Sequence, residues 1–207
     1  LWVLVVAFTF FLPKLETPPA AAHLTWHERL GLDALTLLKN PDHRVVFITA
    51  ALFNIPIAAM FPFTPPHLLE LGLKHTTAWL SLGQVTEIIA MFALAGLFAR
   101  WRIKWILAMG LGLGLLRYAF CALDSRFGLL AGLSLHGCAF TLVMITSQLY
   151  LEERIDPAWR SRAQSLFALM TSGVGNLIGY LGTGWWFNSC TQAGGTQATQ
   201  TIAVEAG

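Results

Sequence analysis

The sequence predicts an all-α membrane protein, and three observations support that fold class. Of the 207 residues, 56% are hydrophobic and only 12% are charged, with a mean hydropathy of +0.61, whereas soluble domains carry about 25% charged residues. Several long, nearly uncharged segments have roughly the length that a helix needs to cross a bilayer. No period-two strand pattern competes with them, and in lipid only helices or closed barrels satisfy the backbone hydrogen bonds.

The chain opens on a short apolar run, Leu1–Leu12. About 20 residues are needed to span a bilayer, so we expect this run to be the end of a transmembrane helix, in a fragment truncated at both ends. Residues 13–44 are more polar and are expected to form a cytoplasmic linker. Within it, Leu30–Lys39 could form a short amphipathic helix that ends before Pro41. A solvated linker without that helix is the alternative.

Residues 45–189 are expected to form a bundle of five transmembrane helices. The expected spans are Val45–Phe63, Ala78–Ala99, Trp105–Leu123, Gly128–Tyr150 and Ser165–Phe187. The first span should kink or break at its prolines, which are Pro56, Pro62, Pro65 and Pro66. Residues 190–207 lack periodicity and favour an outer loop or a disordered tail. Close helix contacts are expected at glycines four residues apart, namely Gly110/Gly114, Gly128/Gly132 and Gly175/Gly179.

Basic residues predict the orientation of the bundle. If the linker is cytoplasmic, nearly all lysines and arginines outside the spans fall on its side, and only Lys74 and Arg126 fall on the other. This distribution follows the positive-inside rule. Arg117 lies within a span. The three cysteines show no metal or redox spacing, and we expect no metal, no cofactor and no disulfide framework.

The strongest functional signal is Glu87, a carboxylate inside the span Ala78–Ala99. An unpaired charge at membrane depth costs several kcal/mol, so such residues are retained mainly where a substrate, an ion or a proton uses them. Gln84 lies one turn earlier on the same helical face and offers both a donor and an acceptor to a neutral polar ligand. We therefore expect a transport site at which Glu87 loads and releases a proton.

Other polar groups fall into the same layer of the membrane. The helical rise places Glu87, His136 and Arg117 at depths of about 13, 12 and 9 Å below the predicted outer ends of their spans. Asn176 lies somewhat deeper, and Phe140 follows His136 by one turn. Three ionisable groups at one depth on three helices predict a shared cavity, in which Phe140 could stack on an aromatic ligand.

Several alternatives to a transport site stay open. Glu87 and Arg117 could form a structural ion pair that offsets the cost of burying both charges. His136 could simply be hydrogen-bonded to a neighbouring helix, and Phe140 could face lipid or pack within the bundle. In that case the protein would be a structural helix bundle without a transport site. An intramembrane enzyme using Glu87 and His136 as acid and base is another alternative, although the spans lack a second carboxylate, a metal-binding histidine pair and an activated nucleophile.

Ordered motifs run through four of the spans. They are Ser81-Leu82-Gly83-Gln84-Val85-Thr86-Glu87, Leu116-Arg117-Tyr118-Ala119-Phe120, His136-Gly137-Cys138-Ala139-Phe140, and Arg162-Ala163-Gln164-Ser165-Leu166-Phe167 followed by Met170-Thr171-Ser172-Gly173. These motifs resemble the nucleoside:proton symporter family of the major facilitator superfamily, specifically its C-terminal six-helix half. The resemblance covers roughly residues 30–187.

The resemblance implies roles for individual residues. Gln84 and Glu87 match positions that bind the nucleoside, and Glu87 would also couple transport to the proton. Phe140 matches an aromatic residue of the binding site, and His136 stands where a family member carries tyrosine. The family can present glutamine and asparagine in its seventh helix, where this sequence has Pro62-Phe63-Thr64-Pro65.

The resemblance also implies a fold and a function for the whole protein. The chain would supply five full spans and one partial span of the C-terminal bundle, and the missing N-terminal half would complete the cavity. The expected activity is nucleoside import with a proton across the bacterial inner membrane, by a carrier that is neither an enzyme nor a nucleic-acid-binding protein. A carrier for a sugar or a small aromatic acid is the nearest alternative.

Overall fold

A computed structural model describes residues 8, 10–11 and 32–205 of the chain. The chain divides into two compact units, Leu1–Asp33 and Ala34–Gly207, and the description below concerns the second. Most of the predicted partial span, Leu1–Leu12, and the linker as far as residue 31 lie outside the described residues.

The described part of the chain is helical and contains no strand. A short 3-10 helix, η1 (Leu32–Lys39), precedes three long helices, α3 (Pro41–Glu70), α4 (Thr76–Arg100) and α5 (Ile103–Cys121). The next span is one continuous run of α6 (Arg126–Phe140), the π-helix η2 (Thr141–Ile145) and α7 (Thr146–Arg154). The last run consists of α8 (Arg160–Ala168), the π-helix η3 (Leu169–Gly175) and α9 (Asn176–Glu205).

Five of these runs are long and apolar enough to cross a membrane, as the sequence predicted. The first begins earlier than expected because Asn40 caps it: the Asn40 side chain accepts hydrogen bonds from the backbone N–H groups of Asp42 and His43. Pro41 occupies the first helical turn, where its missing N–H group costs no hydrogen bond.

Two expectations about helix ends differ from the structure. Of the kink or break expected at the prolines, the break is wrong, because α3 continues through all four of them to Glu70. A break at membrane depth would expose unpaired backbone groups to lipid, which favours a continuous helix. The tail, expected as a loop, is helical as far as Glu205, because extending an existing helix adds a hydrogen bond for each residue that is fixed.

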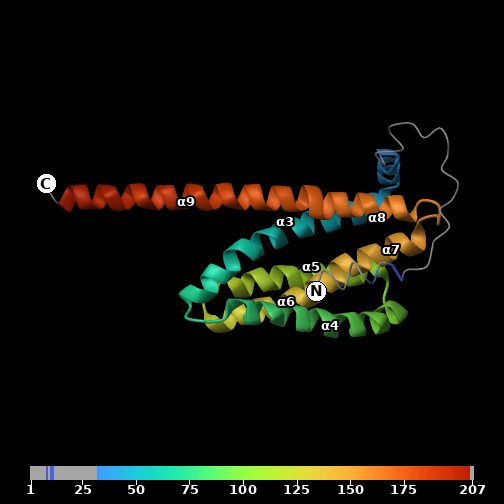
Figure 1. Cartoon of the computed structure of the whole chain (residues 1–207), viewed down its shortest axis with the longest axis horizontal. Coiled ribbons are helices and arrows are strands. Elements are labelled where there is room, and N and C mark those ends of the chain that lie inside the picture. Colours follow the sequence, from blue (N-terminus) through green and yellow to red (C-terminus); the bar gives the residue numbers. More distant parts are fainter. Residues whose placement is uncertain (1–7, 9, 12–31, 206–207) are drawn as a thin grey trace. The chain divides into compact units, whose positions relative to one another are not determined.

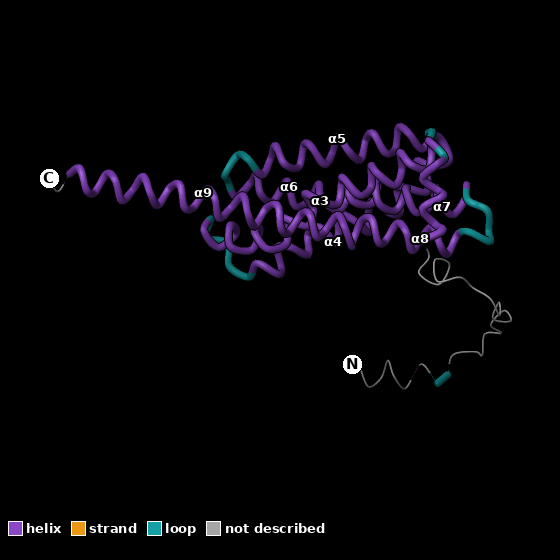
Figure 2. The backbone as a smooth tube through the Cα atoms, turned by 90° about the horizontal axis from the view of Figure 1, so that it is seen from above, coloured by secondary structure: helices purple, strands orange, loops and turns teal. Residues whose placement is uncertain are grey.

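Helix packing places α6 at the centre of one group of helices. Both α4 and α5 pack along α6, while α3 packs along η3 and the first part of α9. A buried core joins the two groups and includes Phe47 and Phe53 of α3, Val143 of η2 and Phe167 of α8. The C-terminal part of α9 extends beyond the other helices (Figure 1, Figure 2).

The predicted glycine pairs are close helix contacts, as expected. A Cβ atom at Gly110 would lie 2.7 Å from Val143 Cγ2, and one at Gly114 would lie 2.9 Å from Phe53 Cε2. The remaining glycines of these pairs are also near a neighbouring segment: the nearest atom to a Cβ would lie within 2.6 Å at Gly128, Gly132 and Gly179, and 3.2 Å away at Gly175. Absence of a side chain therefore sets the separation of several helix pairs.

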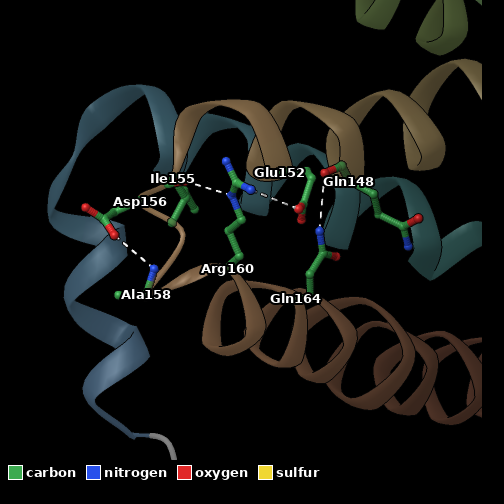
Figure 3. Close-up of polar contacts among 7 residues, drawn as sticks. All are labelled: Gln148, Glu152, Ile155, Asp156, Ala158, Arg160 and Gln164. Atoms are coloured by element: carbon green, nitrogen blue, oxygen red, sulfur yellow. Dashed lines mark hydrogen bonds and ion pairs between the residues drawn. The ribbon is translucent and has the colours of Figure 1, made fainter. Parts of the chain in front are cut away.

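The loop between α7 and α8 is held by polar contacts (Figure 3). The Arg160 side chain donates to the Ile155 carbonyl at 3.2 Å and lies 3.4 Å from a Glu152 carboxylate oxygen. Asp156 accepts from the Ala158 N–H group at 2.9 Å. These contacts tie the end of one span to the start of the next, on the side of the bundle predicted to be cytoplasmic.

Candidate functional site

The candidate site lies where α4 crosses α6. A Cβ atom at Gly137 of α6 would overlap the Gly83 carbonyl, the Glu87 N–H group and the Thr86 hydroxyl of α4. Only glycine permits so close an approach. The Thr141 hydroxyl donates to the Glu87 carbonyl at 3.4 Å and extends the contact by one turn. This crossing therefore fixes the backbone of Glu87 against α6.

Gln84 and Glu87 lie at the edge of the crossing. Gly83, Ala90 and Leu94 are the buried residues of α4, whereas Gln84 is exposed and Glu87 is half-buried. Among the described residues, the Glu87 carboxylate makes no ion pair and no hydrogen bond. Both side chains are thus available to a ligand, a proton or another protein segment.

His136 and Arg117 form a buried pair between α6 and α5. Arg117 is 2% exposed and His136 is 5% exposed, and Arg117 Nη1 lies 2.9 Å from His136 Nδ1. A second guanidinium nitrogen donates to the Met60 sulfur of α3, and the guanidinium carbon lies 4.7 Å from the centre of the Tyr118 ring. The alternative ion pair between Arg117 and Glu87 is not formed among the described residues.

Phe140 lies beside His136, as the sequence spacing suggested. Their ring centroids are 6.0 Å apart with an angle of 50° between the planes, and Phe140 is partly buried. The ring edge of His136 that bears Cδ2 faces α4, because Cδ2 lies 3.3 Å from the position of a Cβ atom at Gly83. The crossing thus brings the Glu87 backbone against α6, where buried His136 contacts Arg117 and Phe140.

Sequence reasoning missed one polar residue, Asn54 of α3. Its side-chain N–H groups donate to the Thr171 carbonyl at 2.8 Å and to the side-chain oxygen of Asn176 at 2.6 Å. Thr171 belongs to η3, and a π-helix leaves carbonyl groups outside the regular hydrogen-bond ladder. A lone amide within the apolar span Val45–Phe63 was the available signal, since buried polar groups require a partner.

A separate cavity of about 650 Å³ lies beside the buried pair. Residues of α3, α5, α6 and α9 line it, among them Met60, Arg117, Tyr118 and Leu133, whereas Gln84 and Glu87 do not. The described residues contain no cluster of histidine, cysteine and acidic side chains placed to hold a metal ion.

Comparison with known families gives one match over the whole chain. The model of the nucleoside H+ symporter family matches residues 1–207. The chain is 36% identical over 180 residues to YegT of Escherichia coli (strain K12), which covers 84% of this chain and 42% of that protein. It is 28% identical over 206 residues to the nucleoside permease NupG of the same organism, covering 92% of this chain and 49% of NupG.

Two further comparisons agree with this assignment. The xanthosine permease of E. coli is 28% identical over 197 residues, covering 88% of this chain and 47% of the permease. The crystal structure of NupG matches with a TM-score of 0.62 and 28% identity, over 86% of this chain and 47% of that structure. The chain therefore spans about half the length of these relatives, and the predicted fold, a helical bundle of the major facilitator superfamily, is confirmed.

Proposed function

This chain belongs to the nucleoside H+ symporter family. We propose that it supplies one side of the transport site, the side that carries Glu87, in a proton-coupled nucleoside importer. The chain is part of a multi-pass integral membrane protein, and we place it in the cytoplasmic membrane. The N-terminal half of such a carrier would supply the opposite wall, since alternating access requires one bundle to rock against another around a central site.

The observation that carries this proposal is the state of Glu87. Its backbone is fixed at the crossing of α4 and α6, yet its carboxylate has no partner among the described side chains. A structural carboxylate at membrane depth would be paired, because an unpaired charge there is costly. A carboxylate that is held in place but chemically free is suited to take up and release a proton.

The surrounding groups fit a polar ligand that has an aromatic ring. Gln84 is exposed one turn from Glu87 and can donate to and accept from a base edge or a sugar hydroxyl. Phe140 is only partly buried and offers a ring face for stacking. We assign binding to Gln84, Glu87 and Phe140, with His136 as a second donor behind them, and proton coupling to Glu87.

Arg117 supports one alternative cargo. A buried cation beside a 650 Å³ cavity would attract an anion, so a carrier for a small aromatic acid remains the second candidate. The guanidinium is already bonded to His136 and Met60, which favours the neutral nucleoside. An enzymatic role is less well supported, because the relatives are permeases and, among the described residues, Glu87 has no second carboxylate or activated nucleophile beside it.

Uptake of radiolabelled uridine tests the proposal. The full natural polypeptide is expressed in cells that lack other nucleoside carriers, with and without a pH gradient, as wild type and as Glu87→Gln. We expect gradient-driven uptake in the wild type and its loss in Glu87→Gln, with unchanged membrane abundance. Glu153→Gln is the matched control, because Glu153 lies exposed near the end of α7.

Competition identifies the cargo in the same assay. Unlabelled adenosine and thymidine should reduce uridine uptake, whereas glucose and benzoate should not. Uptake that ignores both the gradient and Glu87→Gln would refute proton coupling through this residue. Competition by benzoate alone would favour the carrier for an aromatic acid.

A further inference from the structure

The contact between Arg117 and His136 fixes where the histidine carries its proton. A guanidinium group has five N–H donors and no acceptor, and it stays protonated in proteins. Arg117 Nη1 lies 2.9 Å from His136 Nδ1, so Nδ1 must supply the lone pair. A neutral imidazole whose Nδ1 accepts has its proton on Nε2.

The other edge of the same ring faces the transport site. Nε2 is bonded to Cδ2, the ring atom that lies against Gly83 of α4. Gln84 and Glu87 follow on that helix within one turn. His136 Nε2 has no hydrogen-bond partner among the described residues, so its N–H group is free to donate to an acceptor at the edge of the crossing.

We propose that Arg117 is a positioning residue that holds His136 as the neutral tautomer protonated at Nε2. His136 then presents a fixed donor towards α4, and Glu87 alone exchanges the proton. The assignment of that donor to a substrate oxygen rests on the proposed function, whereas the tautomer itself does not. Protonation of His136 at Nδ1 would require the bond from Arg117 to break and would place two cations side by side.

Other charged and titratable groups do not offer His136 a competing partner. Away from the ends of the packed spans, these groups are Arg117, Tyr118 and Cys121 of α5, Glu87 of α4 and Cys138 of α6; Lys104, Arg126 and Arg100 lie at the ends of α5, α6 and α4, and His67 and Glu70 of α3 line the cavity beside Arg117. Among the described residues, Glu87 is the carboxylate nearest in membrane depth to His136, and it forms no ion pair. The tautomer is therefore set by Arg117.

Solid-state NMR of the full natural polypeptide, labelled with 15N-histidine and reconstituted in lipid bilayers, reports the tautomer directly. The His136 signal is assigned by its absence in His136→Tyr. We expect a neutral ring with one proton on Nε2, unchanged between about pH 5.5 and about pH 8, the range in which an ordinary histidine titrates. A proton on Nδ1, or a doubly protonated ring within that range, would overturn the proposal.

Variants of Arg117 separate positioning from general stability. Arg117→Lys keeps a donor and should retain the Nε2 tautomer, whereas Arg117→Met should give a mixture of tautomers and a ring that titrates. Arg126→Met is the matched control, because Arg126 bonds to the Leu71 carbonyl away from this site. If Arg117→Met leaves the wild-type spectrum unchanged, Arg117 does not position His136. These spectra need no transport, so a failure of uridine uptake would refute the proposed function alone.

Discussion

The close approach of α4 and α6 makes a strong prediction for Gly137→Ala. The added methyl group would overlap three atoms of α4, two of them in the backbone, and backbone atoms cannot rotate away. Since non-bonded heavy atoms settle at about 3.5 Å, the helices must separate by about 1 Å. Overpacking of this kind costs about 1–3 kcal/mol. It also moves Glu87 away from His136 and Phe140.

The assay combines thermal stability in detergent with uridine uptake. We expect a lower melting temperature for Gly137→Ala and an uptake loss of about tenfold or more, because a misplacement of about 1 Å can cost up to about a hundredfold in rate. Gly112→Ala and Gly96→Ala are the controls, because a Cβ atom at either position would meet nothing within 4 Å. They should be neutral or stabilising by up to about 1 kcal/mol. Equal behaviour of Gly137→Ala and Gly112→Ala would refute the proposed crossing.

Two further predictions concern buried and exposed amides. Asn54→Leu should lower the free energy of unfolding by about 1–3 kcal/mol, because it leaves the Thr171 carbonyl and the Asn176 side chain without their partner. Thermal unfolding measures this loss, and Leu52→Ala, at an exposed position of the same helix, is the control. An equal effect of the two substitutions would contradict the prediction. In a background without native cysteines, Gln84→Cys should react with a water-soluble thiol reagent and Ile89→Cys should not, although Ile89 is also exposed in this chain. Absence of labelling at Gln84→Cys, as at Ile89→Cys, would place Gln84 in lipid.

The fold was largely predictable because its determinants are local. Apolar length fixed the five spans, and glycine spacing indicated which faces approach closely, as Gly110 and Gly179 show. The failures concern where helices end. Pro62 and its neighbours suggested a break, but α3 is continuous. A break would expose several unpaired backbone groups to lipid, which costs more free energy than the hydrogen bonds that the prolines remove. Composition also suggested a loop where α9 continues.

Sequence spacing indicated a common depth for the candidate residues but did not indicate which side chains contact one another. Helical rise placed Glu87, His136 and Arg117 at one depth, and the structure joins them through α6. The partner of Arg117 depends on the rotation of α5 and on the reach of its side chain, neither of which the sequence contains. The same reasoning explains why Asn54 was missed, since its partner lies on a distant helix, α9.

The span that contains α6 is more buried within the chain than α4, which carries Gln84 and Glu87. In the span Arg126–Arg154, 61% of the most apolar stretch is buried, compared with 17% in Thr76–Arg100. Exposed Val85, Ile89 and Phe92 of α4 can face lipid without cost, but Gln84 cannot, because its amide would lose its hydrogen bonds there. α4 therefore carries polar Gln84 beside residues that face lipid. Gln84 requires water or protein opposite it, and a substrate passage between two bundles would lie there.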